Sequence, residues 1–281
     1  MASFPDLFDL TGRVAVVTGG AGLLGSEFCQ TLFEANATTI IADINELAAT
    51  DLAGSLNESV KSVGIEPRAI PMVVDIATKR SVGTLFEKVA EDHKQVDILV
   101  NAAAIDPKFD PESLEASNSE FGFEDYPLEL WKHALDTNLT GIFLCCQAAG
   151  KLMLAQGRGV MINVSSIYGM VGPDQRIYQS DEKPERYKPA YYSTTKAGIL
   201  GLTRYLAAYY RNKNIRVNAL TPGGVFNEHD QEFVDVYSSR TILGRMGEKN
   251  EMNGALLFLA SDASTYMTGS NLVVDGGWTA W

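Results

Sequence analysis

The sequence has few of the side chains that bind metals or form disulfides. Its 281 residues include only three cysteines and three histidines, and none of these is spaced as a metal-ligand set. Cys145 and Cys146 are adjacent in the apolar segment GIFLCCQAA. We interpret them, together with Cys29, as buried and chemically inert thiols, and we expect no metal mechanism.

The chain also lacks an excess of positive charge and a long hydrophobic run. It has 23 Lys and Arg against 35 Asp and Glu, a net charge of −12, so its field does not attract nucleic acid or an anionic membrane. No apolar run approaches the ~20 residues that cross a bilayer, and no segment has the order of a signal peptide. We therefore expect a cytoplasmic protein without a nucleic-acid or membrane partner.

Short apolar runs alternate with longer segments of helical period. This is the pattern of βαβ units that build a parallel sheet covered on both faces. We predict one α/β domain over residues 1–281 with a doubly wound parallel sheet of about seven strands. The predicted strands are 13–18, 38–42, 69–74, 96–101, 160–165, 216–220 and 271–274, and the predicted helices are 24–36, 46–63, 79–94, 128–156, 191–211 and 249–261.

Two loop insertions are expected to interrupt this alternation. Residues 106–127 are acidic and contain three prolines, and residues 172–190 combine three prolines with many charged side chains. We expect both on the carboxyl side of the strands, where ligands bind in such sheets. A further segment, 226–247, contains Tyr237 and Arg240 and is predicted to form a lid over a substrate.

The first predicted strand runs directly into a glycine-rich turn, TGGAGLLG, and then into a helix. Gly19 allows the tight turn, Gly22 lets backbone N–H groups approach a pyrophosphate, and Gly25 lets the helix pack closely on the sheet. Leu23 and Leu24 begin the helix whose N-terminus would receive the phosphates. The alternative is a turn that binds nothing, but the strand and helix around it favour a dinucleotide site.

An acidic residue at the end of the second predicted strand favours NAD over NADP. Asp43 follows Gly25 by 18 residues, close to where a carboxylate accepts hydrogen bonds from the adenosine ribose and repels a 2′-phosphate. The alternative is that Asp43 only caps the helix that begins near Asn45. Asp75 and Ile76 follow the third strand and are predicted to bracket the adenine, or else to form an exposed turn.

Seven motifs follow one another in a specific order: TGGAGLLG, Asp75-Ile76, Asn101-Ala102-Ala103-Ala104, Asn138 in DTNLTG, Ser165-Ser166, Tyr192 with Lys196, and Pro222-Gly223. With this order the chain resembles the short-chain dehydrogenase/reductase family over nearly its whole length. The resemblance implies a Rossmann fold, a homodimer or homotetramer, and further cofactor contacts from Asn101, Ala102, Ala103, Pro222, Gly223 and Val225.

The sequence departs from the family pattern at two places. The usual Asn-Asn-Ala-Gly after the fourth strand is replaced by Asn101-Ala102-Ala103-Ala104, so one amide and one glycine are missing. The threonine that usually follows Pro-Gly and helps to hold the nicotinamide amide is replaced by Asn227.

Tyr192 and Lys196 form the expected catalytic centre. A tyrosine with a pKa near ~10 is poorly suited to remove a hydroxyl proton at neutral pH. Lys196 lies one helical turn later, and we expect its ammonium, with the positive nicotinamide ring of NAD⁺, to lower the pKa of Tyr192. Tyr191 is the alternative, but position 195 is Thr.

The resemblance assigns the remaining catalytic roles. It implies that Lys196 also holds the nicotinamide ribose and that Ser166 donates a hydrogen bond to the reacting oxygen. Ser165 is the alternative if the register is shifted by one residue. Asn138 would support a water relay to Lys196, or else only stabilise its helix.

The segment between Ser166 and Tyr192 is about twice the family's usual length, and its basic residues are candidates for binding an anionic group of the substrate: Arg176, Lys183, Arg186 and Lys188. The alternative is a solvated loop whose acidic residues balance these charges. SSIYG, this insert and PGGVFN also look similar to bacterial flagellin-glycosylation and nonulosonate-sugar oxidoreductases.

These patterns predict an NAD-dependent oxidoreductase that interconverts a secondary alcohol and a ketone. The expected substrate is a small polar molecule: a sugar, a polyol or a nucleotide-linked sugar. The alternatives are a ketoreductase for a small or acyl ketone and, from a different class, a non-catalytic dinucleotide-binding sensor.

Overall fold

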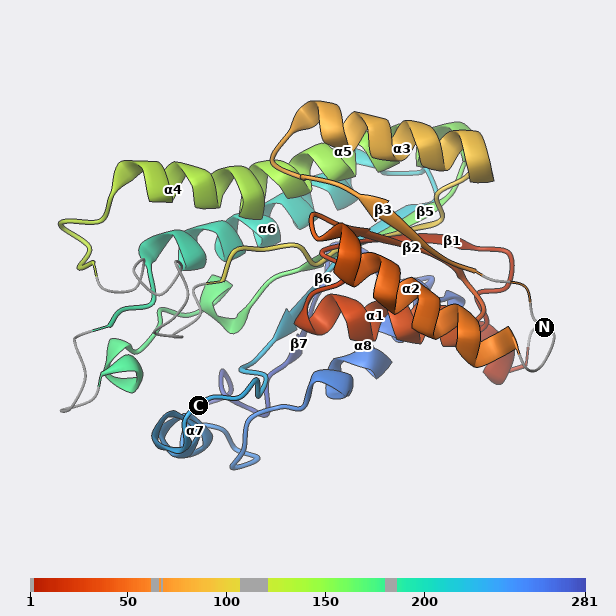
Figure 1. Cartoon of the computed structure of the whole chain (residues 1–281). Helices are drawn as coiled ribbons and strands as arrows, with labels where there is room; N and C mark the ends of the chain where they lie inside the picture. The colour runs from red at the N-terminus through yellow and green to blue at the C-terminus, as the bar shows by residue number, and fades with distance from the viewer. Residues whose placement is uncertain (1–2, 62–65, 67, 107–120, 180–185) are drawn as a thin grey trace.

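The computed structural model describes residues 3–61, 66, 68–106, 121–179 and 186–281. Its sheet has seven parallel strands in the order β3-β2-β1-β4-β5-β6-β7 (Figure 1). The strands are β1 (Val14–Thr18), β2 (Thr38–Asp43), β3 (Ala69–Val73), β4 (Ile98–Asn101), β5 (Gly159–Val164), β6 (Ile215–Pro222) and β7 (Asn271–Val274). The predicted doubly wound Rossmann sheet is therefore confirmed.

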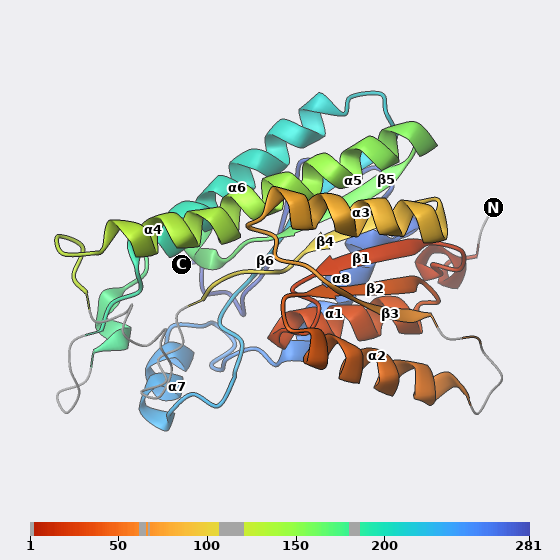
Figure 2. The ribbon, with the colours of Figure 1, turned by 45° about the horizontal axis from the view of Figure 1, so that its top comes forward.

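Helices cover both faces of the sheet (Figures 1 and 2). One face carries α3 (Lys79–His93), α4 (Leu128–Leu135), α5 (Ile142–Gln156) and α6 (Ala190–Tyr209), and the other carries α1 (Leu23–Glu34), α2 (Glu46–Lys61) and α8 (Asn253–Ala260). An additional helix, α7 (Gln231–Ser238), lies beyond the sheet.

The continuous apolar runs of the strands result from burial on both faces. Along β1, Val14 and Val16 join the core under α3, α5 and α6, whereas Ala15 and Val17 join the core under α1, α2 and α8. Side chains of a strand alternate between faces, so a strand between two helix layers needs apolar residues at every position. This requirement makes the strands easy to recognise in the sequence.

The predicted helix 128–156 passes the length and hydropathy test for a membrane span, with a mean hydropathy of 1.2. In the structure its apolar side chains serve the core, since Ile142, Cys145 and Met153 are fully buried against the sheet. The three cysteines are buried, and burial raises the pKa of each thiol. They therefore fit the interpretation of inert core thiols.

The strand order reverses between β1 and β4, and this reversal positions the site. In doubly wound sheets a ligand crevice opens at this point, outside the carboxyl ends of the strands. The glycine turn follows β1, residues 102–106 follow β4, and Ser166 and Gly223 follow β5 and β6. The segments that follow β1, β4, β5 and β6 therefore converge at the carboxyl ends of the strands. Residues 107–120 and 180–185 of the two predicted loop insertions, with Lys183, lie outside the described residues.

Candidate active site

The glycine turn after β1 is built so that side chains are excluded from it. Gly19 has a φ of +66°, and a Cβ there would lie 2.5 Å from the Ala103 Cα. A Cβ on Gly25 would lie 1.9 Å from the Gly19 carbonyl oxygen. The turn and the helix start are thus in direct backbone contact, as Gly19 and Gly25 were expected to allow.

The N-terminus of α1 has the character of an anion site. Gly22 is its N-cap and supplies no side-chain cap, and Leu23 and Leu24 occupy the first turn. The first N–H groups of a helix have no intrahelical acceptor and attract negative charge. The turn therefore fits the pyrophosphate of a dinucleotide.

The Asp43 carboxylate ties the end of β2 to the glycine turn. Its Oδ2 accepts a hydrogen bond from the Ala21 N–H (2.9 Å), and its Oδ1 accepts one from the Asn45 N–H (2.9 Å). The N-cap contact of α2 comes instead from Asn45, whose Oδ1 accepts from the Ala48 N–H. Asp43 therefore holds a negative charge at the crevice as well as shaping the turn.

Asp75 and Ile76 form the turn between β3 and α3, and their predicted contact with an adenine stays a prediction. The Asp75 carboxylate accepts hydrogen bonds from the Ala77 N–H (3.0 Å) and the Thr78 hydroxyl (2.8 Å), as in a turn that precedes a helix. Ile76 is buried, and a Cβ on Gly141 would lie 2.8 Å from its Cδ1. The Asp75 carboxylate therefore shapes this turn, and each of its oxygens can accept a further hydrogen bond.

The Asn101 side chain is turned into the sheet instead of toward the crevice. It is fully buried, and its Nδ2 donates to Asn163 Oδ1 (2.8 Å) and to Cys146 Sγ (3.3 Å). The expected cofactor contact therefore does not come from this amide. The backbone beyond it, at Ala102 and Ala103, lies beside the glycine turn, where the Ala102 N–H donates to the Thr18 oxygen (3.1 Å).

The segment after β6 also borders the crevice. Pro222 ends the strand, and the Gly223 N–H donates to the Val274 oxygen (2.8 Å). Val225 forms an isolated parallel bridge with Gly247. The bridge ties the start of the predicted lid to its end, and the exposed Asn227 lies just beyond Val225.

Ser166, Tyr192 and Lys196 meet at the carboxyl end of β5. The Ser166 side chain lies close enough to the Tyr192 hydroxyl to influence its pKa, and the Lys196 Nζ lies 5.7 Å from the Tyr192 ring centroid. Ser165 instead donates its hydroxyl to the Lys196 carbonyl oxygen (2.8 Å) inside the core. Tyr191 is buried against Tyr126 (ring centroids 6.1 Å apart). Of each neighbouring pair, the structure places Ser166 and Tyr192 at the site.

In the protein alone, the pKa of Tyr192 is raised; the lowering that we expect from Lys196 together with the nicotinamide ring stays a prediction. Burial raises the pKa of Tyr192 well above its usual value, and the charge of Asp106 adds to this rise, whereas the hydrogen bond from Ser166 opposes it. Burial also lowers the pKa of Lys196 to about 8, and its Nζ donates to the Val164 oxygen (3.0 Å). Desolvation of both groups outweighs the attraction between phenolate and ammonium.

Asn138 fixes the loop after β4 to the helix layer. Its Oδ1 accepts from the Ile105 N–H (2.7 Å), and its Nδ2 donates to the Ile105 oxygen (2.9 Å). It lies in a π-helical turn, Asp136–Gly141, between α4 and α5. Such turns are rare and frequent at functional sites. The side chain thus clamps the chain that leads to Asp106, a contact that the sequence did not predict.

A third apolar cluster packs against Tyr192. It joins Tyr192 to the described part of the loop insertion and to the predicted lid through Ile167, Tyr168, Ile177, Tyr178, Phe233, Val234, Tyr237, Met246 and Trp278. Tyr237 stacks on Trp278 (centroids 4.3 Å apart), and its hydroxyl accepts from the Gly224 N–H. Arg240 of the lid forms an ion pair with Asp174 of the loop.

The sequence did not single out Asp106 as a residue of the site. It ends the described chain after β4 and forms an ion pair with Lys188. Lys188 is one of the four loop cations predicted to bind an anionic substrate group. Among the three that the structure describes, it is the one buried beside Tyr192, with its Nζ 4.1 Å from the ring centroid. The available signal was position alone: Asp106 lies five residues after a central strand, and Lys188 lies one helical turn before Tyr192.

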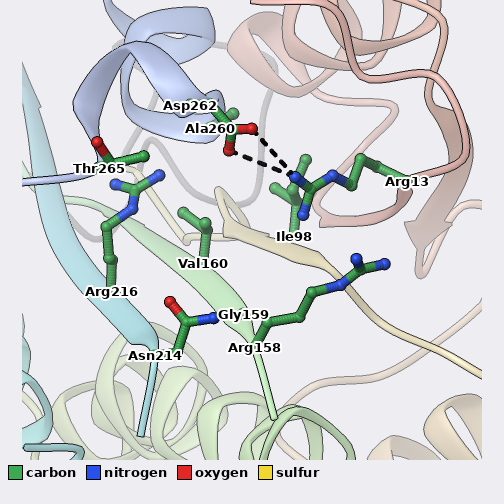
Figure 3. A pocket seen from close by; sticks show the side chains of 10 residues that line it. All are labelled: Arg13, Ile98, Arg158, Gly159, Val160, Asn214, Arg216, Ala260, Asp262 and Thr265. Carbon is green, nitrogen blue, oxygen red and sulfur yellow. Dashed lines mark hydrogen bonds and ion pairs between the residues drawn. The ribbon is translucent and has the colours of Figure 1, made fainter. Parts of the chain in front are cut away.

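A separate pocket of about 140 Å³ lies at the amino ends of the strands, among Arg13, Arg158 and Arg216 (Figure 3). Its charges are used within the protein. Arg13 pairs with Asp262 (3.3 Å), Arg158 Nε donates to Asp97 (2.8 Å), and Arg216 donates to backbone carbonyls. This pocket is therefore a structural junction of the amino ends of the strands, remote from the glycine turn.

Comparison with known proteins agrees with this geometry. The family model described as enoyl-(acyl carrier protein) reductase matches residues 21–279. A solved structure of a short-chain type dehydrogenase/reductase from Mycobacterium marinum is 31% identical and superposes with a TM-score of 0.82, covering 100% of both chains. The chain belongs to the short-chain dehydrogenase/reductase family. It is an oxidoreductase of the class that acts on CH–OH groups.

Relatives in this family act on several small hydroxylated molecules. The cis-4-hydroxycyclohexanecarboxylate dehydrogenase of Sinomonas cyclohexanicum is 34% identical over 95% of this chain and 97% of its own. The structure of a gluconate 5-dehydrogenase from Burkholderia cenocepacia in complex with NADP and tartrate is 29% identical, with a TM-score of 0.81 and coverage of 99% and 100%. Dehydrogenases of glycerol, galactitol and D-threitol are similar at 30–32% identity.

Proposed function

We propose that this enzyme interconverts a secondary alcohol and a ketone with NAD as its cofactor and a small, polar, hydroxylated molecule as its substrate. The observation that carries the proposal is that Ser166, Tyr192 and the buried ammonium of Lys196 lie together at the carboxyl end of β5. These groups and the glycine turn lie at the carboxyl ends of the strands. When bound there, a nicotinamide accepts or supplies the hydride.

The residues of the site handle the proton and the charge on the reacting oxygen. The raised pKa of Tyr192 keeps its hydroxyl protonated at neutral pH, so it can deliver a proton to a ketone oxygen that becomes a hydroxyl. The Ser166 hydroxyl donates a hydrogen bond to the same oxygen as negative charge develops. The Lys196 ammonium compensates the phenolate that remains on Tyr192. For alcohol oxidation the proton moves the other way.

The preference for NAD rests on the carboxylate of Asp43. It lies at the end of β2 and faces the backbone of the glycine turn, where the ribose of an adenosine is held in such folds. A 2′-phosphate at this place would meet a like charge. Solved neighbours include complexes with NAD⁺ and with NADP, so Asp43 itself is the basis of the proposal.

The substrate class follows from the relatives and from the covered site. Several relatives are named as dehydrogenases of polyols or of hydroxy acids, and the cluster of tyrosines and Phe233 packs next to Tyr192. A ketoreductase for an acyl ketone is the second candidate, since two relatives are named 3-oxoacyl-[acyl-carrier-protein] reductases. A sugar or nucleotide-linked sugar remains a prediction of the sequence.

We further propose a cytoplasmic homodimer or homotetramer. The family commonly assembles in this way, and the exposed, stacked Tyr205 and Tyr209 of α6 (centroids 6.1 Å apart) are apolar surface that an interface would cover. Sedimentation equilibrium of the purified chain would test the assembly.

Turnover with each cofactor tests the proposed function. We expect NADH to form from NAD⁺ with at least one member of a panel of polyols, sugars and hydroxy acids. Asp43→Asn, which keeps an acceptor for the Ala21 N–H, should lower the ratio of kcat/KM for NAD⁺ over NADP⁺ about tenfold, because ~1.4 kcal/mol of charge repulsion is removed. Asp51→Asn on the exposed face of α2 is the control. An unchanged ratio in Asp43→Asn would contradict the NAD assignment.

A further inference from the structure

The site contains a second buried ammonium that the family roles of Ser166, Tyr192 and Lys196 do not explain. Lys188 is only 8% exposed, and its Nζ lies 4.1 Å from the centroid of the Tyr192 ring, nearer than the Lys196 Nζ at 5.7 Å. An ammonium over an aromatic face is attracted by the ring. Burial of a charge is nevertheless unfavourable unless an anion accompanies it.

The backbone at Lys188 is held in place by the loop insertion. Its N–H donates to Gln175 Oε1 (2.8 Å), and its carbonyl oxygen accepts from Gln175 Nε2 (3.0 Å). This pair of hydrogen bonds fixes the residue just before α6 begins at Ala190. Gln175 of the loop insertion therefore helps to position an ammonium beside the Tyr192 ring.

The anion that accompanies Lys188 is itself half exposed. Asp106 forms the ion pair, and 55% of its side chain is accessible to solvent, against 8% for Lys188. The ammonium is therefore on the inner side of the pair and the carboxylate on the outer side. Asp106 can turn into water with little loss of solvation, whereas Lys188 always needs a negative partner.

The charge of Lys188 also acts on the neighbouring cations. Burial is the main cause that lowers the pKa of Lys196. The charge of Asp106 opposes this lowering, and the charge of Lys188 adds to it. Burial is also the main cause that lowers the pKa of His229 in the predicted lid, and Lys188 again adds to it. His229 stacks on Phe233, with centroids 5.0 Å apart. An anion at Lys188 would be favoured by the two ammonium groups of Lys188 and Lys196, whereas His229, whose pKa is lowered, is neutral at neutral pH.

We propose that the substrate carries a carboxylate, that this carboxylate binds Lys188, and that it replaces Asp106 as the partner of the buried ammonium. This inference rests on the proposed function, since it places the substrate's charged end beside Tyr192. Lys188 thus determines specificity, and Asp106 is a stand-in for the substrate that keeps the ammonium paired. A hydroxy acid or keto acid has the required combination of groups.

A matched pair of substrates tests the assignment. The probes are cis-4-hydroxycyclohexanecarboxylate and its carboxamide, or another hydroxy acid and its amide if the panel favours one. In Lys188→Met we expect the ratio of kcat/KM for the acid over the amide to fall tenfold to a hundredfold, the range for loss of a charge-assisted hydrogen bond. Lys188→Arg should keep most of the preference, and Asp106→Asn should lower the KM for the acid.

A control and a binding measurement separate the possible failures. Lys151→Met, on the exposed face of α5, should leave the ratio unchanged, and circular dichroism should show that each variant is folded. Binding of cyclohexanecarboxylate to the enzyme with NADH, measured by calorimetry, needs no turnover and should weaken at least tenfold in Lys188→Met.

The outcomes decide between the two claims. Turnover of neutral polyols without a preference for acids, or a ratio that Lys188→Met leaves unchanged, overturns the carboxylate site and leaves the proposed function intact. A preference for a phosphate ester of a polyol over the acid also overturns the carboxylate assignment. Carboxylate binding that depends on Lys188 in a protein that oxidises and reduces none of the panel contradicts the proposed function, and with it the role of Lys188 in specificity.

Discussion

Replacement of Gly25 by alanine tests the backbone contact that forms the cofactor turn. A Cβ at position 25 would lie 1.9 Å from the Gly19 carbonyl oxygen, and ordinary contacts begin at 3.4 Å, so these atoms must separate by a further 1.5 Å. The neighbours at 2.8 and 3.0 Å are also backbone atoms of the turn, which cannot rotate away as a side chain can. Overpacking of this kind costs about 1–3 kcal/mol and occasionally more.

The helical position partly offsets this cost. Alanine is favoured over glycine inside a helix by about 1 kcal/mol. With an overpacking cost near the upper end of its range, about 3 kcal/mol, we expect Gly25→Ala to lower the free energy of unfolding by about 2 kcal/mol. For a chain of this size that loss corresponds to a decrease in Tm of roughly 4–8 °C. Because the turn itself must move, the affinity for NADH should also fall about tenfold.

Differential scanning fluorimetry and an NADH fluorescence titration measure these two effects. The matched control is Gly54→Ala in α2, where a Cβ would meet nothing within 4 Å, and there Tm should stay constant or rise slightly. Gly25→Ala with the Tm and NADH affinity of the unmodified enzyme would refute the reasoning that close backbone contact shapes the cofactor turn.

Three further changes are expected to have measurable effects. Ketone reduction should slow above a pH of about 8, where the buried Lys196 loses the proton that stabilises the Tyr192 phenolate; a kcat constant from pH 7 to 10 would argue against this. Asp97→Ala should lower the free energy of unfolding by about 2 kcal/mol, measured by urea denaturation. The carboxylate is 1% exposed and accepts hydrogen bonds from Arg158 (2.8 Å) and from the Val14 N–H (2.9 Å); an unchanged urea midpoint would contradict this. Arg240→Met breaks the ion pair between lid and loop and should raise KM severalfold with a Tm change under ~1 °C; equal KM values would show that the pair does not close the lid.

Local constraints made much of the fold predictable from the sequence. Strands buried on both faces need apolar residues throughout, and the glycine turn needs small residues at Gly19 and Gly25 whatever surrounds it. The helix α7 was missed because eight residues show too little of the helical period. Its local signal was Asp230, whose carboxylate accepts from the Phe233 N–H (2.9 Å) as an N-cap.

The electrostatics of the site depended on distant residues and could not be predicted in the same way. The spacing of Tyr192 and Lys196 indicated their proximity but not the desolvation by surrounding side chains, which raises the pKa of Tyr192 in the protein alone. Asp106 and Lys188 are 82 residues apart in the sequence, and only the fold makes them a pair. Asn101 looked like a cofactor ligand, but its Asn163 partner lies on the next strand.

The most direct test of the catalytic assignment is Tyr192→Phe, which removes one oxygen atom and keeps the ring that packs beside Tyr168 (centroids 6.5 Å apart). Stopped-flow measurement of NADH formation, together with Tm and NADH affinity, separates loss of chemistry from loss of structure. We expect Tm within ~2 °C of the unmodified enzyme, near-normal NADH binding, and a kcat reduced by at least ~100-fold, the lower end for loss of a general acid–base group. A variant that binds NADH and retains most of its turnover would show that the proton passes through another group.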